Sequence, residues 1–262
     1  IREVKSEEIP EFDILTGGFP CQSFSIIAQN PKRLGVKDER GKLFFEMCRI
    51  LRERQPKCFI AENVKGILTA NKKSAFPLIM KEFEESGYDV QYRILNSANY
   101  GVPQKRERVI IVGFRKDLNV NFSFPDVEIE DENNFAPLKK VIEKKVDEKY
   151  FFSERAVAGM MKKRESMNKG RAQDINKPCN TVGAHLAKVS LNSTDPVLME
   201  DKRYRRFTPR EVARIQSFPD DFELVGSEAA QYRALGNAMP PVMFWYVAKA
   251  CLLYPSDAAD DL

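Results

Sequence analysis

The sequence predicts an α/β domain with a largely parallel sheet, followed by a smaller domain. Two observations predict the sheet: short apolar runs typical of buried strands recur along the first 116 residues, and stretches with helical apolar spacing separate them. A third observation predicts the smaller domain, because the chain is polar and weakly periodic from about Lys116 to Lys202. A chain of 262 residues has room for both.

Four strands and two helices are expected in the first domain. Apolar runs predict the strands, and apolar residues three or four apart predict the helices. The glycine-rich residues 16–20 predict a loop that ends the first strand, and the charged residues 31–41 predict a long mobile loop. The expected strands are residues 12–15, 58–61, 90–95 and 108–114, and the expected helices are residues 42–54 and 75–86.

Two helical patterns return towards the C-terminal end. Residues 206–218 have a helical pattern with Thr208 as N-cap, Pro209 in the first helical position and Glu211 in the third. Residues 236–253 are compactly apolar and predict a terminal helix after a Pro-Pro pair, whereas the small, acidic residues 255–262 predict a disordered tail.

Composition excludes several classes of protein. No apolar run approaches the roughly 20 residues that span a bilayer, and no secretory signal is visible, so a soluble intracellular protein is expected. The five cysteines are scattered and odd in number, and His185 is the single histidine. A disulfide framework or a metal site is therefore not expected.

The net charge of +4 is too small to indicate a nucleic-acid partner, but basic residues cluster at 105–108 and at 202–206. Two interpretations stay open for these clusters. They form either solvated surfaces or a contact with a polyanion such as DNA.

Cys21 is the first candidate for chemistry. It follows the first expected strand in the run Gly17-Gly18-Phe19-Pro20-Cys21, and active residues of open α/β sheets gather at the carboxyl ends of strands. A thiol in such a loop is a nucleophile if its pKa is lowered. The alternative is a small buried apolar residue.

Glu62 follows the second expected strand and should emerge at the same edge of the sheet as Cys21. A carboxyl group there can donate a proton if burial raises its pKa. The alternative is an ordinary surface glutamate.

Arg106 and Arg108 precede the last expected strand, and strand alternation places both on one face. Two fixed guanidinium groups can hold a phosphate or a base carbonyl. The alternative is a salt bridge with Glu107.

Six such fragments, in this order and at these spacings, resemble cytosine-C5 DNA methyltransferases, and the resemblance spans residues 12–253. They are Phe19-Pro20-Cys21-Gln22, Arg40-Gly41-x-Leu43-Phe44, Glu62-Asn63-Val64, Gln104-x-Arg106-x-Arg108, the run from Arg206 through Thr208-Pro209-Arg210-Glu211 and Gln216 to Pro219, and Gly236-Asn237.

The resemblance implies a Rossmann-like doubly wound sheet of the S-adenosylmethionine-dependent methyltransferase type, lacking its first strands, with a smaller target-recognition domain. The implied division is residues 1–116 for part of the catalytic domain, 117–232 for target recognition, 233–254 for a helix returning to the catalytic domain and 255–262 for the tail.

It also implies the roles of the site residues. Cys21 adds to C6 of a cytosine flipped out of duplex DNA, and Glu62 contacts the N3 and N4 edge. Arg108 holds the O2 carbonyl, and Arg106 supports the pocket against Glu62 or a phosphate. The methyl group comes from S-adenosylmethionine, and no metal takes part.

The resemblance further implies contacts with cofactor and DNA. Phe19, Pro20 and Asn237 are expected at the cofactor. Side chains that can read or hold DNA are expected at Gln22, Ser23, Ser25, Arg171, Lys188 and Arg206. His185 is expected to be a hydrogen-bonded structural residue.

The chain departs from the family's pattern at its start, where the first strand, the Phe-x-Gly-x-Gly loop and an acidic ribose-binding residue are missing. Three hypotheses follow: a methyltransferase read from an incomplete chain, one subunit of a split enzyme completed by a small N-terminal partner, or a DNA-binding remnant without activity. The isolated chain is expected to bind cofactor poorly. A cytoplasmic protein of bacterial or phage origin, acting in restriction-modification, is expected by resemblance. A cysteine hydrolase is disfavoured, because its only possible imidazole partner would be His185.

Overall fold

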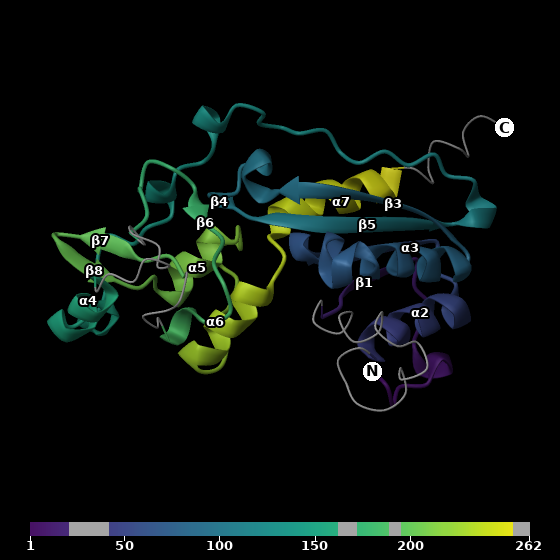
Figure 1. Ribbon diagram of the computed structural model, residues 1–262, viewed down its shortest axis with the longest axis horizontal. Coiled ribbons are helices and arrows are strands. Elements are labelled where there is room, and N and C mark those ends of the chain that lie inside the picture. Colours follow the sequence, from purple (N-terminus) through teal and green to yellow (C-terminus); the bar gives the residue numbers. More distant parts are fainter. Residues whose placement is uncertain (21–41, 162–171, 189–194, 254–262) are drawn as a thin grey trace. The chain divides into compact units, whose positions relative to one another are not determined.

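The computed structural model describes residues 1–20, 42–161, 172–188 and 195–253. The chain forms two compact units (Figure 1). Unit 1 comprises the described residues of Ile1–Leu95, Glu107–Pro125 and Val247–Leu262, and unit 2 comprises those of Asn96–Arg106 and Asp126–Tyr246. The sequence prediction placed its domain boundaries after residues 116 and 232.

A four-stranded sheet forms the centre of unit 1. Its strand order is β1 (Ile14–Gly18), β2 (Cys58–Val64), β5 (Glu107–Arg115) and β3 (Tyr88–Asn96). β1 and β2 are parallel, whereas β5 is antiparallel to β2.

The sheet is therefore mixed, and β5 is the strand that departs from the expected parallel arrangement. A parallel connection needs a crossover of a dozen or more residues, and only ten residues separate β3 from β5. Figure 1 shows β5 running opposite to β3.

Helices cover both faces of this sheet, as in a doubly wound fold. α2 (Lys42–Arg54) and α3 (Ala75–Glu85) pack through Phe44 and Phe83 against Phe59 of β2. On the other face, Cys58 hydrogen-bonds Cys251 of α7 (Pro241–Leu253). The predicted helix at 42–54 is confirmed residue for residue, and the predicted helix at 75–86 is confirmed to within one residue.

All four strands extend further than expected at their C-terminal ends, β1 and β2 by three residues each. β1 continues through the glycines at 17 and 18, which were expected in a loop, and β2 continues to Val64. The pairing of Thr16, Gly17 and Gly18 with residues of β2 supplies ladder hydrogen bonds that a local apolar pattern does not reveal. Glu62 consequently lies inside a strand rather than beyond its end.

Unit 2 has its own core around α5 (Pro209–Ile215) and α6 (Glu228–Asn237), formed by residues such as Phe207, Val212, Tyr232 and Leu235. The predicted capping box is confirmed: Thr208 accepts from the Glu211 amide, and Glu211 accepts from the Thr208 amide. The helix ends at Ile215, three residues earlier than expected.

The remaining described elements are short. Unit 2 contains α4 (Glu154–Met161), a parallel pair of β4 (Gln104–Lys105) with β6 (Cys179–Asn180), and an antiparallel pair of β7 (Leu198–Glu200) with β8 (Arg203–Arg205). Single 3-10 turns lie at Ser6–Glu8, Lys65–Leu68, Ala70–Lys73, Ser97–Tyr100, Lys116–Leu118, Glu132–Asn134, Leu138–Lys140, Glu148–Tyr150 and Leu186–Lys188.

Candidate active site

Glu62 owes its position to the register of three strands. It lies opposite Gly18 of β1 on one side and opposite Ile110 of β5 on the other. A Cβ atom at Gly18 would lie 3.4 Å from Oε2 of Glu62, in ordinary van der Waals contact. The carboxylate of Glu62 therefore lies directly beside the main chain at the end of β1.

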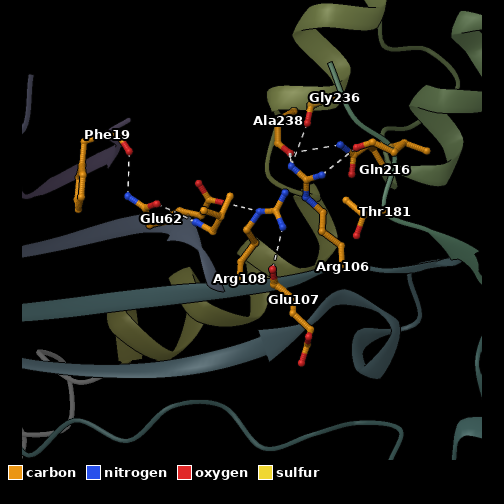
Figure 2. Close-up of polar contacts among 12 residues, drawn as sticks. Phe19, Glu62, Arg106, Glu107, Arg108, Thr181, Gln216, Gly236 and Ala238 are labelled. Atoms are coloured by element: carbon orange, nitrogen blue, oxygen red, sulfur yellow. Dashed lines mark hydrogen bonds and ion pairs between the residues drawn. The ribbon is translucent and has the colours of Figure 1, made fainter. Parts of the chain in front are cut away.

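Arg108 is the diagonal cross-strand neighbour of Glu62, since Arg108 pairs with Val64 and Ile110 pairs with Glu62. Its Nε lies 2.7 Å from Oε1 of Glu62, and the two side chains are only 12% and 18% exposed (Figure 2). Its Nη1 donates to the carbonyl oxygen of Glu107 at 2.8 Å. The guanidinium group is therefore held in one orientation.

Burial lowers the pKa of the Arg108 guanidinium, and the charge and hydrogen bond of Glu62 oppose that shift. A largely buried ion pair of this kind is costly to desolvate, and removal of one partner leaves the other charge without compensation. Such pairs are typical of functional sites as well as of structural networks. The position of this ion pair, at the C-terminal end of β2 and the start of β5, favours the functional interpretation.

Asn63 ties the end of β1 to the end of β2. Its side chain is 3% exposed, and its Nδ2 donates to the main-chain oxygen of Phe19 at 2.9 Å (Figure 2). Its Oδ1 accepts from the amide of Val64. Phe19 is two residues before Cys21, so Asn63 fixes the start of the segment that carries the candidate nucleophile beside Glu62. The sequence motif included Asn63 but gave it no role.

Cys21 itself lies outside the described residues, as do Gln22, Ser23, Ser25 and Arg171. The other four cysteines, Cys48, Cys58, Cys179 and Cys251, are described, buried and not in disulfides. Burial raises the pKa of the Cys48 thiol to about 12, which makes it a packing residue rather than a nucleophile.

An apolar groove of about 220 Å³ lies along β1 in unit 1. Its lining suits the uncharged parts of an organic cofactor rather than a metal or a phosphate. The ring of Phe19 is only 6% exposed and packs edge-on against Phe44, so it offers the groove little more than its edge and main chain. The groove is lined by Ile1, Leu15, Thr16, Gly17, Gly18, Phe19, Leu43, Glu46, Met47 and Ile50.

Arg106 belongs to unit 2, and its side chain is 2% exposed. It was expected to support the pocket against Glu62 or a phosphate. Its described hydrogen bonds instead go to the main-chain oxygens of Val182, Gly236 and Ala238 (Figure 2). The alternation argument fails here because β5 begins only at Glu107, so Arg106 is not part of that strand.

The other predicted contact residues are dispersed. Asn237 is exposed at the end of α6, and Lys188 ends a 3-10 turn. Arg206 lies over the ring of Tyr150 at 5.3 Å from its centroid and donates to the carbonyl of Ala187. It therefore has packing partners of its own, and its predicted contact with DNA stays a prediction.

Comparison with solved structures defines the class of protein. The chain is similar to the Dnmt2 methyltransferase of S. pombe, with a TM-score of 0.72, 20% identity and coverage of 97% of this chain and 82% of that chain. It is also similar to a putative DNA modification methyltransferase of an E. coli prophage, with a TM-score of 0.64, 20% identity and coverage of 95% and 80%. The fold is therefore that of a Rossmann-like α/β methyltransferase.

The sequence comparison identifies the family. The family model for C-5 cytosine-specific DNA methylases matches residues 1–253. The chain is 38% identical to the Type II methyltransferase M.FnuDI of Fusobacterium nucleatum, covering 95% of this chain and 79% of that protein. It is also 38% identical to M.NgoFVII of Neisseria gonorrhoeae, covering 95% and 72%. The chain belongs to the C-5 cytosine-specific DNA methylase family and is a DNA (cytosine-5-)-methyltransferase.

No described helix is long and apolar enough to cross a membrane. Within the same residues, no group of three or more His, Cys, Asp or Glu side chains is placed to hold a metal ion.

Proposed function

We propose that this protein transfers the methyl group of S-adenosylmethionine to C5 of a cytosine flipped out of duplex DNA, as part of a restriction-modification system. The observation that carries the proposal is the buried Glu62–Arg108 pair beside the segment that leads to Cys21. The Type II relatives and their bacterial sources favour the role in restriction-modification and a bacterial or phage origin.

Cytosine C5 is a poor nucleophile, and the proposed residues overcome this in order. The thiolate of Cys21 forms a bond to C6, and the electrons of the C5–C6 double bond move towards C5 and the ring. Glu62 shares its proton with N3 and accepts from the N4 amino group, which neutralises the developing negative charge. Arg108 donates to the O2 carbonyl and keeps Glu62 in place.

Bound S-adenosylmethionine would supply an electrophilic methyl group, and transfer of that group to C5 would break its bond to sulfur and release S-adenosylhomocysteine. A base such as water would then take the proton from C5, so that the C5–C6 double bond re-forms, the thiolate of Cys21 leaves C6 and the ring regains its aromatic system. A base inside a duplex cannot reach these groups, so flipping must precede the chemistry at a cost of a few kcal/mol.

The groove along β1 is the proposed place for the apolar parts of S-adenosylmethionine in unit 1, with the Gly17-Gly18-Phe19 segment as its wall. The two glycines permit close approach of a ligand to the backbone. Its small volume and apolar lining fit part of the adenine and the methylene groups of the methionine portion rather than the whole molecule. In unit 2, Asn237 is the proposed polar contact.

The test is transfer of a labelled methyl group to mixed-sequence duplex DNA, with detection of 5-methylcytosine by mass spectrometry of nucleosides. We expect slow methylation by the wild type, in keeping with the weak cofactor binding expected of this chain, none by Cys21→Ala, and a loss of about a hundredfold or more in kcat for Glu62→Gln, because a positioned acid contributes about that much. Glu107→Gln is the matched control, since Glu107 is exposed and pairs only with Lys65 across the surface.

A second readout is the trapped adduct on DNA that contains 5-fluorocytosine. Fluorine at C5 cannot leave as a proton does, so the bond from Cys21 to C6 should persist after methyl transfer. Wild-type protein that methylates DNA without forming this adduct, or Cys21→Ala protein that still methylates it, contradicts the proposal.

A further inference from the structure

Three buried polar side chains in unit 2 hold the segment that contains Asn237. Gln104 and Gln216 are 0% exposed and Arg106 is 2% exposed. A polar side chain is rarely buried to this degree unless its hydrogen-bonding groups are satisfied, and removal of a partner carries the full desolvation cost. The positions of these three side chains are therefore tightly determined by their partners.

The guanidinium of Arg106 spans two segments that are far apart in sequence. Its Nη1 donates to the oxygen of Val182 at 3.1 Å, and its Nη2 donates to the oxygens of Gly236 and Ala238, both at 3.0 Å. Gly236 and Ala238 flank Asn237. The planar guanidinium group of an arginine can hydrogen-bond both segments at once, which the single ammonium group of a lysine cannot do.

Gln104 and Gln216 make the same connection a second time. Gln104 accepts from the amide of Val182 at 2.9 Å and donates to Oε1 of Gln216 at 2.8 Å. Gln216 donates in turn to the oxygens of Leu235 and Ala238. Both routes therefore begin at Val182 and end on residues 235–238.

An independent observation concerns the packing of Gly236. A Cβ atom at this position would lie 2.3 Å from the carbonyl carbon of Gly183 and 2.4 Å from the amide nitrogen of Ala184. Backbone contacts of this kind cannot be relieved by rotating a side chain, so only glycine fits. The segment 235–238 is thus held against residues 182–184 both by hydrogen bonds and by backbone packing.

We infer that Arg106 is a positioning residue for cofactor binding: with Gln104 and Gln216 it fixes the 235–238 segment, and so the place of Asn237. The inference rests on the proposed function, in which Asn237 contacts S-adenosylmethionine. Arg106 acts through that segment and not on the cytosine.

The test is equilibrium binding of S-adenosylhomocysteine by titration calorimetry to millimolar ligand, together with steady-state kinetics on the full chain. For Arg106→Lys we expect Kd and the KM for S-adenosylmethionine to rise about tenfold, since at least one charge-assisted hydrogen bond is lost. kcat at saturating cofactor should stay within about twofold, because the chemistry belongs to other residues. Gly236→Ala should shift Kd in the same direction.

The matched control is Arg205→Lys. Arg205 is another fully buried arginine of unit 2, but it pairs with Glu211 and makes no described contact with residues 235–238. We expect this variant to lower the melting temperature and to leave Kd within about twofold of the wild type. Hydrogen exchange followed by mass spectrometry should show faster exchange of the amides at 235–240 in Arg106→Lys than in Arg205→Lys.

The outcomes separate the inference from the function on which it rests. A wild type that binds cofactor, with an Arg106→Lys variant that is less stable yet binds it equally well, overturns the positioning role alone. An Arg106→Lys variant with a lower kcat and an unchanged Kd also overturns the positioning role. A wild type that neither binds cofactor nor methylates DNA overturns both proposals.

Discussion

At the residue scale, the Glu62–Arg108 ion pair is the feature of unit 1 on which the proposed chemistry depends. Each side chain is more than four-fifths buried, and they meet at 2.7 Å. The pair does two things for the proposed reaction. It places a carboxyl group and a guanidinium group side by side, and it holds both by the register of β2 and β5 rather than by a flexible loop.

Arg108→Lys tests whether this geometry matters beyond charge. The lysine keeps the positive charge but loses the Nε contact and the planar fork, so kcat should fall about a hundredfold, as for loss of one fixed donor at a developing charge. KM for DNA should change little. Arg52→Lys, which alters an exposed surface ion pair with Glu82, should leave both constants unchanged. Equal kcat in Arg108→Lys and wild type would remove Arg108 from the mechanism.

At the element scale, β2 and β5 form the rigid support for that ion pair. Phe59 of β2 and Gly113 of β5 show how the two strands pack against each other. The two residues are directly opposed in the ladder. A Cβ atom at Gly113 would lie 2.1 Å from Cε1 of Phe59, so the aromatic ring occupies the space above the glycine. An aromatic residue that covers a cross-strand glycine stabilises both strands.

Gly113→Ala should therefore lower the free energy of unfolding by about 1–3 kcal/mol through overpacking. Urea denaturation followed by circular dichroism measures this. Gly113→Ala should cost less free energy of unfolding when it is introduced into Phe59→Leu than when it is introduced into the wild type. The smaller leucine side chain leaves room for the added methyl group. Strictly additive effects of the two substitutions would contradict this account.

The capping box of α5 makes a second prediction at this scale. Thr208→Ala removes the acceptor for the Glu211 amide and should cost about 1–2 kcal/mol in unfolding free energy. Thr208→Ser keeps the hydroxyl and should cost much less. The same denaturation experiment distinguishes them, and equal losses in both variants would assign the effect to packing of the threonine methyl group.

At the scale of the whole molecule, buried neutral groups make the fold sensitive to alkali. Burial raises the pKa of the Cys48 thiol from about 9 to about 12, and it also raises the pKa of Tyr88 and Tyr232. Their stabilising contribution is complete below the pKa values of the unfolded chain. It is lost as the pH rises towards the folded values, because only the unfolded chain can then release these protons.

The free energy of unfolding should accordingly fall between about pH 9 and pH 12, by about 1.4 kcal/mol per pH unit for each such group. Urea midpoints from pH 8 to pH 11 measure the slope. Cys48→Ala lacks one of these protons and should show a shallower slope above pH 9. Identical slopes in the variant and the wild type would show that Cys48 does not contribute.

Much of this protein was determined by its sequence alone. The family, helix α2 and the capping box at Thr208 could be predicted, because each depends on residue types at short, fixed spacing, and the proposed catalytic roles of Cys21 and Glu62 come from motifs of the same kind. Periodicity and capping are local properties of the chain. The chemistry of a thiol or a carboxyl group likewise belongs to the residue that carries it.

Only the tertiary structure decided where these residues act. The extension of β1 and β2, the antiparallel direction of β5 and the tether from Asn63 to Phe19 depend on pairing between segments distant in sequence. The partners of Arg106 lie 76 to 132 residues away from it. A buried polar group takes whichever acceptors the packed chain brings to it. Arg106 and Arg108, two residues apart in sequence, therefore support different parts of the molecule.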